Sequence, residues 1–347
     1  MTEKIKKRKS LIAVLLMVVA LVSVIGADLA RSNSAASSIS PSFIMGTLVD
    51  VSLRGFGKKS VSEDIFAAMR DDENNILSWR VAASVVGRLN ADRSVADIDL
   101  RVTELLNEIK SVCALTGGRM DLTVGALTKL WDFESGQNKV PSQEEIAAAL
   151  ATVGFQNLTA SGTAAALAGT GSIDLGAFGK GVACDTAWRI LKESRIKGGT
   201  VSVGGSVLVF GEPEKNGAWT IGIRDPDGAA TEVFASLKVE KECVISTSGL
   251  YERGFESGGK YYHHILDAKT GWPAGSGLKS VTIIAPTGLL SDALSTACFI
   301  LGYDESLPLL TQFGVEAVFV GADNTVRVTN GLRTQIVITN GDFVIEW

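Results

Sequence analysis

Short strand-like runs crowd the second half of the sequence, and their close spacing limits the folds that the chain can adopt. Asn and Gly residues typical of tight turns separate the last of these runs. Runs joined in this way form hairpins, so we predict mixed, largely antiparallel sheets rather than a doubly wound parallel sheet. The runs cover residues 200–210, 219–224, 235–239, 261–266, 280–285, 316–320, 325–328, 334–339 and 343–347.

Helix signals are mixed with the strands, which makes α+β the expected fold class. Residues 97–115 place apolar side chains on one face at helical spacing. Ser142 and Glu145 form a capping box that opens another helix, which we expect to reach residue 153. Residues 47–53 alternate like a strand. Further helices are expected at 62–90, with a break near Asn74, Asn75 and Trp79, and at 180–194, 289–301 and 306–313. We expect these helices to flank the sheets.

The first 27 residues differ in composition from the rest of the chain. Five basic residues between positions 4 and 9 precede an uncharged apolar run from Leu11 to Ala27. This pattern is typical of a signal peptide or an N-terminal membrane anchor, and no clean cleavage site decides between the two. Residues 28–42 are predicted to be a flexible linker, and 43–347 the main domain. The N-terminus is therefore expected to enter or cross a membrane, which would make the rest of the protein extracytoplasmic.

Charge and cysteine content narrow the function classes. Without its first 27 residues the chain has a formal charge of −9, compared with −5 for the whole, because that segment holds five bases and one acid. An acidic chain without a basic stripe argues against nucleic-acid binding. The four cysteines are far apart and lie in apolar stretches, which favours buried free thiols, although an exported protein can form disulfides.

The only two histidines of the chain, His263 and His264, are adjacent. Histidine is the side chain best suited to moving a proton near pH 7. Asp267 and a Lys-Thr-Gly turn follow, so we expect the pair where a strand ends and a loop begins. For an isolated pair, a surface position without a role is an equally good interpretation.

Residues 169–181 form a glycine-dense loop that leads into a predicted helix. Glycines let a backbone approach a ligand closely, and a helix N-terminus favours anions. The spacing is not that of a phosphate-binding P-loop, because Gly181 stands where Ser or Thr would hold Mg²⁺. By itself, the loop is equally compatible with a purely structural role.

Asp292 and Thr296 are four residues apart near the start of an apolar helix, so they share one helix face. Together they offer two hard oxygens to Mg²⁺, too few without backbone carbonyls or phosphate oxygens. The alternative is that Ser291 caps the helix and Asp292 stabilises its dipole. Residues 118–125, 203–206 and 245–249 are further polar or small-residue turns that decide nothing alone, and Asp121 in the first of them is also interpretable as a cap.

The order of these segments resembles the ApbE-type FAD:protein FMN transferases. One such block would be weak evidence, but eight blocks in the same order span residues 45 to about 302. The blocks are Met45–Thr47, Leu77–Trp79 with 84–90, Gly118–Phe133, Ile173–Gly181 with Asp185, Gly204-Gly205, Thr247–Gly249 with Tyr251–Arg253, His263–Pro273 and Ser291–Thr296.

The resemblance implies an enzyme that splits FAD at its pyrophosphate. It would pass FMN to a Thr or Ser hydroxyl of an acceptor flavoprotein and release AMP, with Mg²⁺ or another hard cation stabilising the phosphates. The acceptors expected from the family are subunits of extracytoplasmic redox complexes. The fold implied is two intertwined halves around mixed sheets, with FAD between them.

The resemblance also assigns roles to residues. His264 aligns with the catalytic base, whereas His263 is expected to contact only backbone or solvent. Asp292 and Thr296 are the implied metal ligands, together with the backbone carbonyl of Ala177. The residues expected to line the FAD pocket are Met45, Trp79, Arg119, Met120, Asp121, Asp174, Lys180 and Ile265.

Two positions depart from the family pattern. Ala268 replaces the Pro that usually follows His-x-x-Asp, and Cys184 replaces a small apolar residue. Neither change removes a reactive group.

Three rival functions stay open at this point. A metal-dependent FAD pyrophosphatase would use the same ligands with water as the acceptor. A non-catalytic flavin-binding protein would not need His264 beside a metal. A dehydrogenase that uses bound FAD is disfavoured, because nothing in the sequence looks like a site for an electron-transfer partner.

Overall fold

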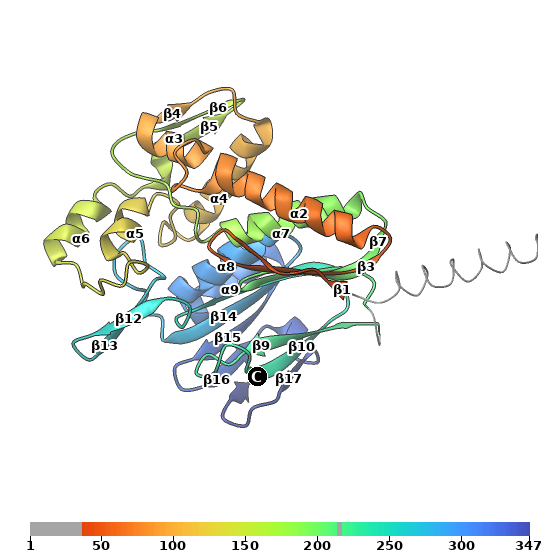
Figure 1. Cartoon of the computed structure of the whole chain (residues 1–347). Coiled ribbons are helices and arrows are strands. Elements are labelled where there is room, and N and C mark those ends of the chain that lie inside the picture. Colours follow the sequence, from red (N-terminus) through yellow and green to blue (C-terminus); the bar gives the residue numbers. More distant parts are fainter. Residues whose placement is uncertain (1–36, 214–216) are drawn as a thin grey trace, which may run out of the picture.

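A large, twisted sheet of ten strands forms the centre of the protein (Figure 1). The structure is a computed structural model, and it describes residues 37–213 and 217–347. The described strands of this sheet pair antiparallel except for β16 with β18, which are parallel. In spatial order they are β1 (Ser37–Ser38), β3 (Thr47–Gly55), β7 (Ile196–Val203), β8 (Ser206–Gly211), β11 (Cys243–Gly249), β14 (Leu278–Ala285), β15 (Glu316–Gly321), β16 (Thr325–Val328) and β18 (Val344–Glu346), with β2 (Ser42–Ile44) on β3.

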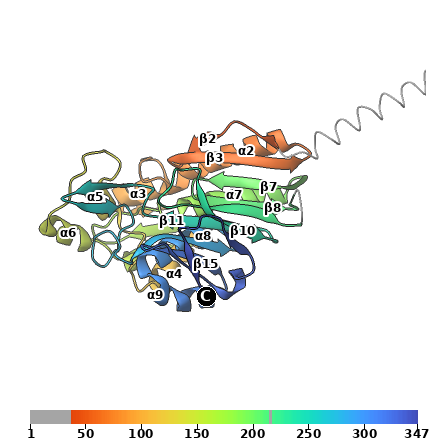
Figure 2. The ribbon, with the colours of Figure 1, turned by 90° about the horizontal axis from the view of Figure 1, so that it is seen from below.

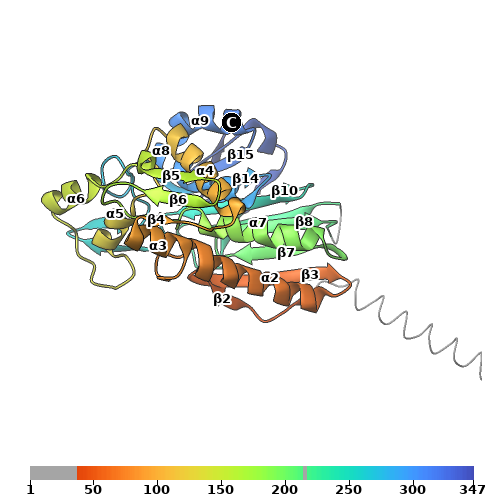
Figure 3. The same cartoon turned by 90° about the horizontal axis from the view of Figure 1, so that it is seen from above.

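Alternation of apolar side chains fixes which face of the sheet is covered by helices. In β3, Val49, Val51 and Leu53 are fully buried, because every second side chain of a strand points to the same face. They pack against two helices that lie side by side in Figures 1 and 3, α2 (Lys58–Asp72) and α7 (Gly179–Lys192). Next to them lies α8 (Gly288–Leu301), followed by α9 (Tyr303–Phe313).

The opposite face of the large sheet carries a small sheet of three antiparallel strands, seen below it in Figure 1 and from below in Figure 2. Its strands are β9 (Trp219–Arg224), β10 (Val233–Val239) and β17 (Ile336–Ile338). Phe234 and Leu237 of β10 fill the space between the two sheets. The large sheet is thus buried on both faces in its middle.

The segment between β3 and β7 folds into a helical module at one end of the sheet (Figure 3). A π-helical turn (Glu73–Leu77) leads into it. It contains α3 (Val85–Asp92), α4 (Leu100–Leu115), α5 (Gly125–Trp131) and α6 (Gln143–Leu150), with a sheet of β4 (Ser94–Val95), β5 (Leu158–Ser161) and β6 (Ala164–Leu167). Because β3 and β7 pair across this insertion, distant parts of the chain interlace in one sheet. Below α5 projects the hairpin of β12 (Gly254–Ser257) and β13 (Lys260–His263).

These observations confirm the predicted α+β class with largely antiparallel sheets. Several boundaries differ by a few residues, among them the helix expected to reach residue 153, which ends at Leu150, and two strand runs differ more. The run 200–210 is not one strand but the hairpin of β7 and β8, because Gly204 adopts a positive φ of 54° at the turn. The run 261–266 ends as a strand at His263, since the following residues close a loop.

Helix ends were predicted with mixed success. The capping box of Ser142 and Glu145 is present. The alternative in which Ser291 caps its helix is wrong, because α8 begins three residues earlier and Thr287 caps it. The Ser291 hydroxyl is buried and donates to the carbonyl of Ile283. The four cysteines are buried free thiols.

The N-terminal predictions fall largely on residues 1–36, outside the described part of the chain. Ser37 and Ser38 pair with β3, so the large sheet extends into the segment that we predicted as linker. None of the described helices is long and apolar enough to cross a membrane.

Candidate active site

His264 is the first residue after β13, at the strand end where we predicted it. Its backbone N–H and its ring Nδ1 both lie within hydrogen-bond distance of the Arg253 carbonyl oxygen, at 3.1 and 3.2 Å. A carbonyl only accepts hydrogen bonds, so Nδ1 must carry the proton and donate it. The lone pair of His264 is therefore on Nε2, which is the atom available to take up a proton.

The surroundings of His264 keep the imidazole neutral. Burial, followed by the positive charges of Arg253 and Lys180, lowers its pKa from 6.5 to about 4. Lys180 is the second residue of α7, so the positive charge at the start of this helix acts on the His264 ring.

His263 has a structural role, as predicted. Its Nε2 donates to the Ala274 carbonyl at 3.0 Å, and its Nδ1 accepts the Ile265 N–H at 3.3 Å. The ring is buried and stands edge-on to Phe299. Both nitrogens are thus used inside the protein, so only His264 is left for chemistry.

The second element of the site is Asp292 on α8. It is 1% exposed, and its Oδ2 accepts the backbone N–H of Gly181 at 3.0 Å. The Nζ of Lys180 lies 2.9 Å from Oδ1, an atom that has no other described hydrogen-bond partner. A buried carboxylate needs such a countercharge, because an unpaired one is strongly destabilised.

Two glycines bring α7 and α8 into contact at this point. A Cβ added to Gly181 would lie 2.1 Å from the carbonyl oxygen of Gly288, and one added to Gly288 would lie 2.1 Å from that of Gly181. Asp185, one turn along α7, accepts the backbone N–H groups of Gly288 and Leu289 at 2.6 and 2.8 Å. The start of α8 is therefore fixed against the start of α7.

Thr296 lies one turn after Asp292 and belongs to a chain of hydroxyls. Ser248 Oγ on β11 lies 3.0 Å from Thr296 Oγ1 and 2.8 Å from Ser295 Oγ. Ala177 is two residues before α7, in the turn whose Gly176 N–H is accepted by Asp174 at 2.8 Å. Among the described residues there is no group of three or more His, Cys, Asp or Glu side chains that could hold a metal.

A hard cation nevertheless fits this donor set. The buried Oδ1 of Asp292 offers a charged oxygen with no described N–H or O–H donor apart from the Lys180 ammonium, and Thr296 adds a hydroxyl. Mg²⁺ in proteins is commonly bound by one or two carboxylates together with substrate phosphates and water. The scarcity of charged ligands thus agrees with a metal that is shared with a diphosphate.

Comparison with known proteins places this arrangement in a family. The model of the ApbE family matches residues 45–319. The chain belongs to the ApbE family. The FAD:protein FMN transferase of Treponema pallidum is 33% identical over 328 residues, which cover 87% of this chain and 90% of the relative. The FAD:protein FMN transferase of Escherichia coli K12 is 30% identical, covering 80% and 82%.

Solved structures agree with this assignment. The ApbE protein of Thermotoga maritima superposes with a TM-score of 0.79 at 30% identity, over 87% of this chain and 99% of that one. The flavinyl transferase ApbE of Pseudomonas stutzeri, in its apo form, gives 0.71 at 29% identity, over 83% and 91%. The predicted resemblance is confirmed, and the protein is an enzyme of the flavin transferase type.

The residues that the ApbE pattern assigns to the FAD pocket fall into two groups here. Met45 turns the β2–β3 hairpin with a positive φ of 53°, and Lys180 faces the site as described. Trp79 is half-buried, with the Arg80 guanidinium 4.3 Å and the Lys129 ammonium 5.0 Å from its ring centre. These three side chains are at least partly accessible.

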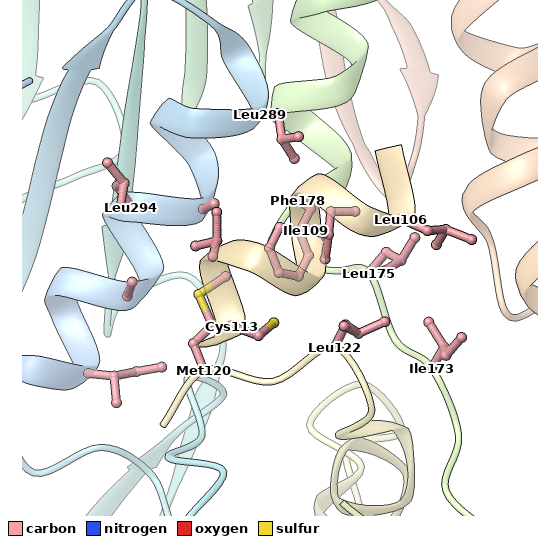
Figure 4. Close-up of a cluster of buried hydrophobic side chains, with 14 of the residues drawn as sticks. Leu106, Ile109, Cys113, Met120, Leu122, Ile173, Leu175, Phe178, Leu289 and Leu294 are labelled. Carbon is pink, nitrogen blue, oxygen red and sulfur yellow. The ribbon is translucent and has the colours of Figure 1, made fainter. Parts of the chain in front are cut away.

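The other predicted pocket residues are engaged inside the protein. Met120 and Ile265 belong to the main core, and Figure 4 shows Met120 beside Cys113 and Leu122. The Asp121 carboxylate is no helix cap: it accepts the N–H groups of Thr123 and Phe155, at 2.8 and 2.7 Å.

Asp174 and Arg119, the last two predicted pocket residues, are half-buried and also make polar contacts. Asp174 accepts the N–H of Gly176. Arg119 forms ion pairs with Asp267 and Glu305.

Arg253 was missed as a site residue, although it ends one of the matching blocks. Its carbonyl holds His264, and its Nη1 lies 2.5 Å from Glu134, which also pairs with Arg80. Its Nη2 lies 3.7 Å from where a Cβ on Gly46 would stand. A single arginine between Glu252 and Gly254 gives no local signal for such a position.

Proposed function

We propose that this flavin transferase moves the FMN half of FAD to a Thr or Ser hydroxyl of an acceptor flavoprotein, in the presence of Mg²⁺, and releases AMP. The observation that carries the proposal is the surroundings of His264. Its Nε2 is unprotonated, and the positive charges of Arg253 and Lys180 act on its ring. Lys180 also pairs with the Asp292 carboxylate. A neutral base beside a cationic pocket suits attack by a hydroxyl on a phosphate.

In the proposed step the acceptor oxygen attacks the phosphorus that carries FMN. A new P–O bond forms, and the bond between this phosphorus and the oxygen bridging to AMP breaks. The hydroxyl proton passes to Nε2 of His264, and AMP leaves with the electron pair. General-base assistance of this kind is typically worth ~10²–10⁴-fold in rate.

The positive side chains would hold the diphosphate in place. Lys180 and Arg253 are both close enough to His264 to lower its pKa, so an anion bound between them would reach the base. The same anion would offset their charge and strengthen His264 as a base, since a nearby negative charge favours the protonated imidazole.

Asp292, Thr296 and the Ala177 carbonyl are the proposed ligands of Mg²⁺. Mg²⁺ held by these residues would supply positive charge that stabilises the phosphates and the leaving AMP. The Gly181 N–H would keep Asp292 in one orientation, because it occupies Oδ2 and leaves Oδ1 toward Lys180.

The proposal includes a compartment and a partner. The basic and apolar pattern of residues 1–27 supports export or anchoring through the membrane, which would place the enzyme outside the cytoplasm with an acceptor subunit of a redox complex. FAD would lie between the helical module and the large sheet, near Met45, Trp79 and Lys180.

The test is to incubate the protein with FAD, Mg²⁺ and a panel of acceptor domains, and to follow AMP release and acceptor mass together. We expect a mass gain equal to an FMN phosphoester, which requires the acceptor hydroxyl. His264→Ala should keep FAD binding and lose transfer, and His264→Gln serves as a matched variant of similar size. AMP and free FMN with no mass gain across the panel would instead establish a pyrophosphatase.

A further inference from the structure

Arg119 makes more contacts than a residue that only lines a pocket would need. Its Nε and Nη2 both lie 2.9 Å from Oδ2 of Asp267, and Nη2 also donates to the Ile300 carbonyl at 2.9 Å. Its Nη1 donates to Glu305 at 3.0 Å. All three nitrogens of the guanidinium are engaged, and the side chain is 24% exposed. Little donor capacity is left for a phosphate.

The main partner, Asp267, organises the loop that starts with His264. Its side chain is 8% exposed, and its Oδ1 accepts the Lys269 N–H at 2.9 Å while Oδ2 accepts Arg119. Its own backbone N–H donates to the Trp272 carbonyl at 2.9 Å. The loop is thus closed around Asp267, and its position depends on what holds this carboxylate.

A backbone contact strengthens the same connection. The N–H of Ala268 donates to the Arg119 carbonyl at 2.8 Å. A proline at this position has no N–H, so the departure from the family pattern noted in the sequence supplies this bond. The side chain and the backbone carbonyl of Arg119 therefore both bind the loop that starts at His264.

The third contact of Arg119 reaches α8. Ile300 lies near the end of this helix, two turns after Asp292, and Glu305 lies in the first turn of α9. One guanidinium thus joins the loop that carries His264 to the helix that carries Asp292 and Thr296. These are the two elements whose relative position the transfer reaction needs.

We propose that Arg119 and Asp267 act as a positioning pair, which fixes the His264 loop relative to α8, instead of binding FAD through the arginine side chain. This inference rests on the proposed function, in which His264 and the ligands on α8 act on one phosphate. A misplacement of about 1 Å of a catalytic group is enough to cost ~10²-fold in rate.

The test compares four variants of the full chain: Arg119→Met, Arg119→Lys, Asp267→Asn and, as the control, Glu305→Gln. FAD affinity is measured by flavin fluorescence, and kcat and KM by AMP release with an acceptor. We expect Arg119→Met and Asp267→Asn to lower kcat by ~10–100-fold with the FAD Kd within about twofold. Arg119→Lys should recover part of the rate.

Two further results are expected from the same set. Glu305→Gln should change neither quantity, since an ion pair with an exposed partner contributes little. The double variant with Arg119→Met and Asp267→Asn should lose no more kcat than either single variant, because both changes remove the same ion pair. An FAD Kd that rises as much as kcat/KM falls, or an unchanged kcat in both single variants, would overturn the proposal.

A structural readout separates this proposal from the proposed function. The chain has two histidines, so ¹³C-histidine labelling gives two imidazole signals, assigned with His263→Gln. We expect the His264 signal to shift in Arg119→Met and Asp267→Asn and to stay in Glu305→Gln, with every spectrum recorded well below the melting temperature of that variant. This outcome supports the positioning pair even if the protein proves to hydrolyse FAD, whereas an unmoved His264 signal contradicts it.

Discussion

Removing the charge of Arg253 should move the acid limb of the pH–rate profile. The pKa of His264 is lowered to about 4, first by burial and then by the charge of Arg253. Arg253→Met deletes that charge, while its carbonyl can still hold the imidazole Nδ1–H. We therefore expect the pKa of His264 to rise, but to stay below 6.5 because the ring is still buried.

The size of the effect follows from the fraction of neutral imidazole. With a pKa of about 4, roughly nine-tenths of His264 is neutral at pH 5. A rise of about one unit corresponds to ~1.4 kcal/mol and would leave roughly half of it neutral at that pH. A fully restored pKa of 6.5 would leave only about 3%. The predicted change is thus a loss of about half the activity at pH 5, relative to the plateau of the same variant.

The assay is kcat/KM for AMP release between pH 4 and 8, since this ratio reports the pKa values of the free enzyme. Each profile is normalised to its own plateau, because Arg253→Met is also expected to weaken FAD binding at every pH. ¹³C-histidine titration of the two imidazole signals gives the pKa directly.

Two variants provide controls of known sign. Arg253→Lys keeps the charge and should leave the acid limb in place. Glu134→Gln removes the carboxylate that pairs with Arg253 and Arg80, so it should lower the pKa of His264 further. The reasoning would be refuted if the acid limb of Arg253→Met coincided with that of the wild type. It would also be refuted if Glu134→Gln moved the acid limb to higher pH, as Arg253→Met is expected to do.

Three further changes test other parts of the structure. Asp292→Asn should weaken Mg²⁺ binding in calorimetry by about tenfold or more, because a neutral amide is a poorer ligand for a hard cation; an unchanged affinity would remove Asp292 from the metal site. Gly181→Ala should lower the free energy of unfolding by ~1–3 kcal/mol in urea titrations, since its Cβ would meet a backbone oxygen. Gly179→Ala, with no atom within 4 Å of the added Cβ, is the matched control, and equal effects of both would contradict this view. Ser142→Ala should cost ~1 kcal/mol through loss of the helix cap, and thermal unfolding without any change would contradict it.

Local patterns predicted what depends on neighbours in the sequence. The capping box of Ser142 needs only residues of one helical turn, and the polar turn after the histidines indicated that a strand ends close to them, although the predicted run reached residue 266. The shared helix face of Asp292 and Thr296 follows from helical geometry in the same way.

Contacts between distant segments had no comparable signal. Arg119 matched a pocket position in the family pattern, but its partners Asp267 and Ile300 are more than 140 residues away in the chain. Arg253 likewise depends on distant segments, since Glu134 lies 119 residues before it and the turn at Gly46 still further away. Even the cap of α8 was misassigned, because Thr287 and Ser291 are both good capping residues and only the strand before the helix decides where it starts.

The contact of Gly181 with Gly288 has a consequence for how the protein can diverge in sequence. Where two helices meet through side chains, each substitution in the layer between them alters their separation. Here backbone touches backbone, so the spacing of Lys180 and Asp292 depends on few side chains, among them Cys184 and Asp185 at the same contact. Sequence change elsewhere in the core should therefore alter the distance between the lysine and the carboxylate less than a change at either glycine would.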